Sequence, residues 1–359
     1  MSDSGLTNDD LSNWIGSVLG EPVGAVRIEP LRSSDSASGV PLFRLVVSST
    51  AGEHRFVLKS ASPDGDWIAR ATADSGVREV ALFRAGLHDQ LPPEIDWPAI
   101  DARPATAGGW LLLMRDLDAG PGVRLVPPGD DAVNEEEVAG HLVHLARLHR
   151  AFIGREELLA DVQLCDTSAW LTMLGFSTIE RERGSNDPVT PHLAAGWDAF
   201  ACLAPVPVVD RVAALLQDPK PLLDALSNGP RTLLHGDFKF GNLGWRAGPP
   251  PATVALDWSQ AMWGPPLLDL AWFLAVNSAR LPIAKEFAIA VYREALGEFY
   301  GDWDRALDLA LLGGGILRLG WAKALGATSD EPAVVARERA EIDWWLSAGE
   351  RALGYLSET

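Results

Sequence analysis

Two polar clusters, whose aspartates Asp237 and Asp257 lie twenty residues apart, interrupt short apolar runs of the chain. The first follows Leu233–Leu234 and reads His-Gly-Asp-Phe-Lys-Phe-Gly-Asn, with Asp237 five residues before Asn242. The second places Asp257 at the end of the run 254–256. Such a loop can present a base to a hydroxyl and an amide oxygen to a metal ion, and the second Asp completes a set of hard oxygen ligands.

This set of residues fits phosphoryl transfer, because that reaction depends on positioned cations and an oriented hydroxyl rather than on covalent chemistry. Asp237 would orient or deprotonate the acceptor hydroxyl. Asn242 and Asp257 would hold Mg²⁺. Lys239 would neutralise the transferring group, although a solvated lysine is the alternative for this position.

These residues, in their order and spacing, resemble the signature of the aminoglycoside phosphotransferase family, which has a protein-kinase-like fold. The resemblance rests on His235-Gly236-Asp237, Asn242, Leu256-Asp257-Trp258 and Pro265-Pro266-Leu267-Leu268-Asp269-Leu270-Ala271. It implies that Asp237 is the catalytic Asp, and that Asn242 and Asp257 are the metal ligands. It also implies that Asp269, with His235, supports the catalytic loop. A coincidence of polar loop residues in an unrelated fold is the alternative.

A nucleotide clamp is expected in the first part of the chain, because kinase-like lobes hold the α- and β-phosphates with a strand Lys that pairs with a helix Glu. Lys59 ends the run Phe56-Val57-Leu58-Lys59, and Glu79 stands at the start of a predicted helix twenty residues later. The two residues fit these roles by position and by chemistry, since a buried ammonium needs a partner. An ordinary edge-strand lysine is the alternative.

Two further segments are candidates for nucleotide contacts. The loop 32–39 lacks the G-x-G-x-x-G spacing of protein kinases, but Ser34, Ser36 and Ser38 could cradle phosphate. An ordinary turn is the alternative there. The run from Trp110 resembles the family's strand and hinge, where backbone groups between Met114 and Asp116 would pair with the nucleotide base. A plain core strand is the alternative. The resemblance implies ATP and Mg²⁺ as cofactors, with GTP not excluded.

The acceptor pocket has only weak candidates in the sequence. Trp263 follows Asp257 closely enough to stack on a sugar or a cation. The last predicted helix carries Glu341 and Asp343, which could grip a cationic acceptor, although a solvated acidic face is the bland interpretation. An amino sugar or aminoglycoside-like hydroxyl ranks first, and another sugar, a choline-like amine, homoserine or a macrolide stays open.

Three histidines on one predicted helix suggest a different kind of site. Glu137, His141 and His144 share a helix face and His149 follows, which is compatible with zinc. However, no second cluster in the sequence completes the coordination. Structural or surface histidines are therefore the favoured interpretation.

The elements that must position these residues form an α+β, protein-kinase-like pattern with two lobes. A capped helix over 7–19 is followed by a hairpin of 43–47 and 55–59, a helix over 78–87 and a strand from Trp110. Residues 1–117 are expected to form the smaller, β-rich lobe. The segment 118–131 looks like a connection, and 118–359 forms a helical lobe that opens with an amphipathic helix over 135–152.

The composition limits the classes of partner. The chain of 359 residues carries a net charge of −19, which disfavours nucleic acid and anionic membrane surfaces. The charge would attract a cationic small-molecule acceptor, although an acidic surface that serves only solubility is the alternative. No apolar run is long enough to predict a membrane span, and the N-terminus lacks a signal-peptide pattern, so cytoplasm is the expected location. The oligomeric state is not indicated.

Two other functions remain as alternatives. A nucleotide-binding pseudokinase with a regulatory role would have little reason to keep the full set of Lys59, Glu79, Asp237, Asn242 and Asp257. A protein kinase is suggested by Lys239, but no activation segment ending in Ala-Pro-Glu follows Asp257. Asp269 follows within twelve residues, which leaves little room for a peptide-docking loop.

Overall fold

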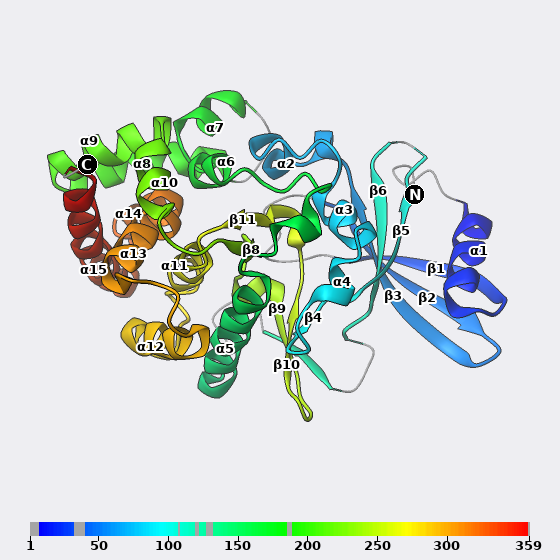
Figure 1. Cartoon of the computed structure of the whole chain (residues 1–359). Coiled ribbons are helices and arrows are strands. Elements are labelled where there is room, and N and C mark those ends of the chain that lie inside the picture. Colours follow the sequence, from blue (N-terminus) through cyan, green and yellow to red (C-terminus); the bar gives the residue numbers. More distant parts are fainter. Residues whose placement is uncertain are drawn as a thin grey trace.

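The structure is a computed structural model that describes residues 7–31, 40–106, 108–118, 122–126, 132–184 and 189–357. Figure 1 shows a β-rich N-terminal lobe beside a larger helical C-terminal lobe. The expected two-lobed, protein-kinase-like α+β fold is thus confirmed. The candidate residues Ser34, Ser36 and Ser38 lie outside the described residues.

The N-terminal lobe is built on an antiparallel sheet with strand order β1-β2-β3-β6-β5. The predicted hairpin is β2–β3, and the predicted strand from Trp110 is β6. The elements of this part of the chain are α1 (Asn8–Leu19), β1 (Val23–Leu31), β2 (Leu42–Ser49), β3 (Gly52–Ala61), α2 (Trp67–Ala71), α3 (Arg78–Arg84), α4 (Leu87–Gln90), β4 (Ile95–Asp96), β5 (Ala99–Pro104) and β6 (Trp110–Arg115).

The two faces of this sheet carry different helices. On one face Leu111 and Leu113 pack with Trp14 of α1. On the other, Leu112 and Met114 pack with the start of α3. This alternation follows from the period of two along a strand. Lys59 of β3 lies opposite Leu112 in the register, so it projects from the face that α3 covers.

Two helix predictions in this lobe have different outcomes. Thr7 caps α1, as predicted, and the structure adds a capping box between Thr7 and Asp10. The single helix expected over 78–87 is wrong, because α3 ends at Arg84 and α4 begins at Leu87. Gly86 lies between them with φ 77°, a left-handed conformation that cannot continue a right-handed helix.

The C-terminal lobe packs its helices and two small sheets around one large apolar core. The amphipathic helix α5 has the predicted bounds. The elements are β7 (Val123–Leu125), α5 (Glu135–Phe152), α6 (Thr167–Thr172), α7 (Phe176–Arg181), α8 (Thr190–Leu203), α9 (Val206–Gln217), α10 (Lys220–Leu226), β8 (Thr232–Leu234), β9 (Leu243–Arg246), β10 (Ala252–Ala255), β11 (Met262–Gly264), α11 (Leu267–Val276), α12 (Lys285–Leu296), α13 (Trp303–Ala310), a π-helix (Leu311–Leu317), α14 (Arg318–Gly326) and α15 (Pro332–Ser357).

The small sheets hold the polar loops of the lobe. One has strand order β4-β10-β9-β7, so β4 from the first part of the chain and β7 from the expected connection both join it. The other pairs β8 with β11. Among the described helices, none has the length and apolar character needed to cross a membrane.

The π-helix lets the C-terminal helices approach α11 closely. It contains three consecutive glycines, and a Cβ atom on Gly314 would lie 2.6 Å from the carbonyl oxygen of Leu268. A larger residue would push the two helices apart. Since α11 carries Asp269 and Trp272, this contact helps to set the position of both side chains.

Candidate active site

The loop after β8 is fixed by a buried aspartate of α11. The carboxylate of Asp269 accepts hydrogen bonds from the backbone amides of His235 (2.7 Å) and Gly236 (2.9 Å). Nε2 of His149 lies 3.3 Å from the carboxylate of Asp269. Nδ1 of the same histidine lies 2.6 Å from the hydroxyl of Tyr292. Residues from α5, α11 and α12 therefore hold the backbone of one loop.

His235 also supports this loop from within. Its Nδ1 accepts a hydrogen bond from the amide of Asp237 at 3.2 Å. Burial lowers the pKa of His235, so the ring is neutral at physiological pH and its Nδ1 can act as an acceptor. The backbone amide of Asp237 is thereby held within the loop.

The carboxylate of Asp237 is buried but has several hydrogen-bond donors. Oδ1 accepts from the indole nitrogen of Trp272 at 3.1 Å. Oδ2 accepts from Nζ of Lys239 (2.8 Å) and Nδ2 of Asn242 (3.0 Å). Burial opposes the charge of Lys239, but the Asp237 carboxylate outweighs this effect and the pKa of Lys239 is raised. Lys239 is therefore charged at neutral pH.

A buried arginine lies behind this loop. The guanidinium of Arg318 stands 4.4 Å from the ring centroids of both Trp170 and Trp272. It donates to the carbonyl of Trp170 (2.9 Å) and to Oε1 of Gln260 (3.2 Å). Burial lowers the pKa of Arg318 to about 10, which still leaves it charged at neutral pH. The charge and the stacked indoles fix the wall of the site.

The two candidate metal ligands are brought together by the hairpin β9–β10. Asn242 precedes β9 and Asp257 follows β10, and the amide of Leu256 donates to the carbonyl of Asn242 at 2.9 Å. Asp257 adopts φ 62°, a left-handed conformation that is uncommon for a residue other than glycine. An amide oxygen and a carboxylate at the ends of two paired strands match the oxygen ligands that Mg²⁺ prefers.

Three charged residues from both lobes meet beside this hairpin. Nζ of Lys59 lies 2.6 Å from Oε2 of Glu79 and 2.8 Å from Oδ1 of Asp257. Burial opposes the charge of Lys59, but the two carboxylates outweigh it and hold the pKa of the lysine above its usual range. Burial likewise opposes the charge of Asp257, and Lys59 holds its pKa well below the usual range. The Lys–Glu pair expected from the sequence is thus extended to Asp257.

The loop that carries Asp237 and the loop that carries Asp257 touch at Gly236. This residue has φ 78°, and a Cβ atom on it would lie 2.1 Å from the carbonyl oxygen of Gln260. No side chain fits in this space. The glycine therefore allows Asp237 and Asp257 to be presented by two loops in direct contact.

The two hinge candidates, Met114 and Asp116, have different positions relative to β6. Met114 is an internal residue of β6, opposite Val57 and Ala99, whereas Asp116 lies just beyond the end of the strand. The carboxylate of Asp116 is occupied by Arg44, whose Nε donates to it at 2.7 Å. The side chain of Asp116 therefore anchors the segment, and only its backbone is placed for other contacts.

The acceptor candidates are scattered. Trp263 is buried on β11, opposite Leu233 of β8. The carboxylate of Glu341 pairs with Nζ of Lys285 at 2.5 Å and accepts from the indole of Trp345 at 3.1 Å. Asp343 lies on the exposed face of α15. Of the two acidic candidates, Glu341 is already held by neighbours and Asp343 is open to solvent.

The helix histidines have structural contacts, and that of His149 is to the hydroxyl of Tyr292. Nδ1 of His141 (2.8 Å) and Nδ1 of His144 (2.9 Å) both lie on the hydroxyl of Thr253, and the rings pack on Trp245. Within the described parts of the chain, no group of three or more His, Cys, Asp or Glu side chains is arranged to hold a metal ion.

Some residues of the site were not indicated by the sequence. Trp272 of α11 donates to Asp237, and Arg318 of α14 packs on Trp272; each belongs to an apolar or weakly patterned helix. Asp66, the N-cap of α2, is buried, and burial raises its pKa to about 6. In the sequence, the only sign of a role for these residues is a polar or aromatic side chain at a position whose pattern indicates core.

Comparison with known proteins gives a consistent result. The profile of the phosphotransferase enzyme family matches residues 43–309 of the 359. A direct search of curated protein sequences finds no match.

Solved structures show the same fold at low sequence identity. A Ralstonia eutropha protein, provisionally assigned as an aminoglycoside phosphotransferase, aligns with TM-score 0.53 at 13% identity, over 97% of this chain and 98% of that one. A spectinomycin phosphotransferase, solved with ADP and spectinomycin, aligns with TM-score 0.51 at 15% identity, over 95% and 94%. A Plasmodium vivax ethanolamine kinase aligns with TM-score 0.50 at 12% identity, over 89% and 82%.

Proposed function

Because the chain belongs to the phosphotransferase enzyme family, we propose that it transfers the γ-phosphoryl group of ATP to a hydroxyl of an amino sugar or aminoglycoside-like acceptor. Membership in the family makes it a phosphotransferase that acts on a small-molecule alcohol. The observation that carries the proposal is the meeting of Lys59, Glu79 and Asp257 from both lobes beside the Asp237 loop.

Lys59 is the proposed phosphate ligand. Glu79 is almost completely buried and holds one side of the ammonium, and Asp257 holds the other. Because the pKa of Lys59 is raised, the ammonium is charged at neutral pH. It can therefore bind phosphate oxygens while it keeps its bond to Glu79. The proposed contact to the nucleotide base is the backbone of Asp116, just beyond the end of β6.

Asn242 and Asp257 are the proposed Mg²⁺ ligands. Their oxygens are hard donors on adjoining loops, and a second carboxylate, Asp66, lies close enough to influence Asp257 electrostatically. This donor set suits an ion that shares its coordination shell with nucleotide phosphates. When bound, Mg²⁺ supplies positive charge to the phosphate oxygens.

Asp237 is the proposed catalytic residue. Its carboxylate is oriented by Trp272 and Asn242 and lies against the ammonium of Lys239. In this arrangement the Asp237 carboxylate would accept the proton of the acceptor hydroxyl, and Lys239 would lie beside the phosphate oxygens that gain charge. Asp269 and His235 keep the loop in place.

The acceptor proposal rests on charge. A net charge of −19 attracts cationic molecules, and an acceptor with amino groups would be concentrated near the protein. Trp263, Glu341 and Asp343 stay as candidates for contacts to it. The fold neighbours named above act on spectinomycin and on ethanolamine, so the fold alone does not select the acceptor.

The test measures ADP release by purified protein with ATP or GTP and Mg²⁺, over a panel of aminoglycosides, amino sugars, neutral sugars and amino alcohols. We expect acceptor-dependent release that is highest with amino sugars or aminoglycosides. Asp237→Asn should remove turnover but keep nucleotide binding, and Asp257→Ala should weaken the Mg-dependent part of that binding.

Three outcomes would contradict the proposal in different ways. Release only with neutral sugars or amino alcohols would overturn the acceptor class. Strong turnover by Asp237→Asn would overturn the role of Asp237. Nucleotide binding without any turnover across the panel would favour a pseudokinase.

A further inference from the structure

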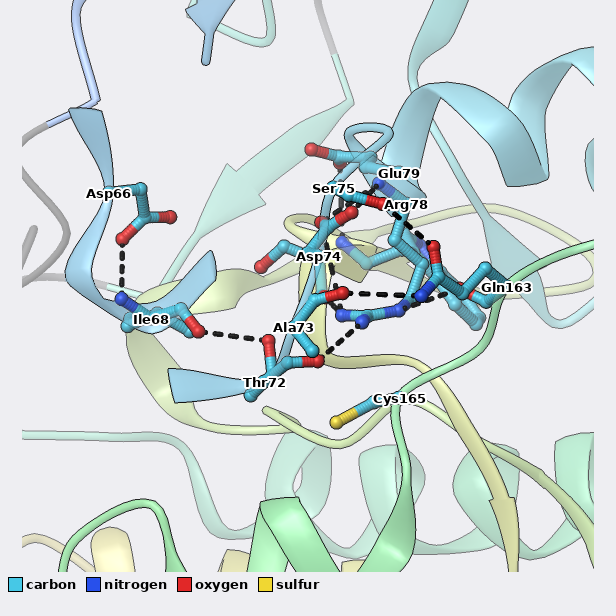
Figure 2. A network of polar contacts seen from close by, with 12 residues as sticks. Asp66, Ile68, Thr72, Ala73, Asp74, Ser75, Arg78, Glu79, Gln163 and Cys165 are labelled. Carbon is cyan, nitrogen blue, oxygen red and sulfur yellow. Dashed lines mark hydrogen bonds and ion pairs between the residues drawn. The ribbon is translucent and has the colours of Figure 1, made fainter. Parts of the chain in front are cut away.

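Arg78, the residue before Glu79, has an almost completely buried guanidinium that contacts three backbone carbonyls. Nε donates to the carbonyl of Gln163 (3.0 Å), Nη2 to that of Thr72 (3.1 Å), and Nη1 to that of Ser259. Figure 2 shows the side chain between the turn that precedes α3 and the segment that carries Gln163. One side chain therefore joins three segments that are distant in the sequence.

These contacts connect the start of α3 to the residues that follow Asp257. Glu79 accepts from the backbone amide of Trp258 at 3.2 Å, and Arg78 donates to the carbonyl of Ser259. The amide of Trp258 and the carbonyl of Ser259 belong to the two residues that follow Asp257. Two consecutive side chains of α3 therefore bind the backbone of the loop that follows Asp257.

The backbone near these hydrogen bonds is strained. Among the described residues, the non-glycine residues with positive φ are Ala73 (52°), Val77 (57°) and Asp257 (62°). Ala73 and Val77 lie on either side of the turn that leads into Arg78, and Asp257 begins the loop that Arg78 holds. A β-branched residue such as Val77 adopts this conformation only where surrounding contacts impose it.

The side chains of Asp74, Ser75 and Gln163 hold the backbone of this turn. The carboxylate of Asp74 accepts from the amide of Arg78 at 2.8 Å. Nε2 of Gln163 donates to the carbonyl of Ala73 at 3.3 Å, and Oε1 accepts from the hydroxyl of Ser75 at 3.2 Å. Figure 2 shows these residues as one network that includes the guanidinium. The network spans from the N-terminal lobe to the segment before α6.

We propose that Arg78 is a positioning residue that holds the 257–260 loop against α3, so that Asp257 is preset for Mg²⁺ beside Lys59 and Glu79. The inference rests on the proposed function. A planar guanidinium can serve three carbonyls at once, which an ammonium on a flexible stem cannot do in the same geometry.

The test is a Mg²⁺ titration of the binding of a fluorescent ATP analogue to wild type and Arg78→Met. The variant should need about tenfold more Mg²⁺ for half-maximal binding, the size typical of losing support around a metal ligand. Binding without Mg²⁺ should stay unchanged. In the ligand-free protein, hydrogen exchange at the amide of Trp258 should become faster. Arg78→Lys should fall between the two proteins.

Trp197→Phe is the matched control, because it also leaves a buried carbonyl, that of Leu174, without its donor, but within the helical lobe. It should lower stability without changing the Mg²⁺ requirement. Gln163→Ala keeps the backbone acceptor and removes only the contacts to Ala73 and Ser75, so it tests the network if Arg78→Met does not fold. It should shift the Mg²⁺ requirement in the same direction by a smaller factor.

The outcomes separate the two claims. An unchanged Mg²⁺ requirement in folded Arg78→Met, or in Gln163→Ala when the first does not fold, would overturn the positioning role and leave the proposed function intact. Wild-type protein that binds the analogue without any Mg²⁺ dependence would overturn the metal site itself, and the positioning role with it.

Discussion

The indole nitrogen of Trp272 donates a hydrogen bond to Oδ1 of Asp237 at 3.1 Å. Trp272 lies on α11 three residues after Asp269, which binds the amides of His235 and Gly236. One helix therefore fixes both the backbone of the loop that carries Asp237 and the orientation of the Asp237 carboxylate. This relationship makes α11 the main support of the candidate catalytic residue.

Trp272→Phe should lower kcat without changing the nucleotide KM. The substitution keeps most of the packing but removes one hydrogen bond to the carboxylate, and the loss of about 1–1.5 kcal/mol corresponds to about a tenfold change in rate. Steady-state kinetics with the acceptor identified in the panel would measure it. Trp197→Phe is the control, and an equal loss of kcat in both variants would refute a specific role for Trp272.

Lys239→Met should lower kcat by about 10²-fold, the cost typical of removing one group that stabilises developing charge. Lys239→Arg keeps the positive charge and should recover part of the rate. The measurement is kcat at saturating nucleotide and acceptor. If Lys239→Met retains full activity, the lysine is a solvated neighbour of Asp237 and not part of the catalytic machinery.

Gly236→Ala should impair both stability and turnover. The new Cβ atom would lie 2.1 Å from the carbonyl of Gln260, and the positive φ is unfavourable for alanine. We expect a loss of about 1–3 kcal/mol in unfolding free energy and a larger relative loss in kcat, because the two loops must separate. Gly354→Ala, where a Cβ atom meets nothing within 4 Å, is the control for urea denaturation and kinetics. Wild-type behaviour of Gly236→Ala would mean that the loops are free to shift.

His141 should make folding stability sensitive to acid. Burial lowers the pKa of His141 to about 3 and that of His144 to about 4. The unfolded imidazole titrates near pH 6.5, as is usual, so between about pH 6.5 and 3 the unfolded state binds more protons. The free energy of unfolding should therefore fall as the pH falls, by up to about 1.4 kcal/mol per pH unit for each histidine.

The test compares urea denaturation of wild type and His141→Phe between pH 7 and 5. The variant lacks one of these groups, so its stability should fall less steeply as the pH is lowered. Asp66, whose pKa is raised to about 6, has the opposite effect on stability in this range, but it is present in both proteins and cancels in the difference. Parallel curves for the two proteins would show that His141 is protonated without cost.

Local sequence patterns were sufficient for the main elements and for the candidate polar residues. The helix over 135–152, the hairpin and the strand from Trp110 follow from apolar periodicity and turn residues, which act over a few positions. The spacing of Asp237, Asn242 and Asp257 is likewise local, because the three residues lie on consecutive short strands and loops. The pairing of Lys59 with Glu79 could be expected because a strand lysine facing a helix needs a carboxylate.

Contacts between distant segments could not be derived in this way. Trp272, Arg318 and Arg78 have ordinary core or helix patterns, and their roles depend on which loop lies beside them. Glu341 was a candidate for the acceptor, but its carboxylate is held by Lys285, a residue of another helix. Periodicity shows which face of an element is buried, whereas the packing of the whole chain decides which buried polar group meets which partner. For this protein, the sequence alone therefore determined the reaction class, and the tertiary structure decided how the two lobes hold the residues proposed to perform it.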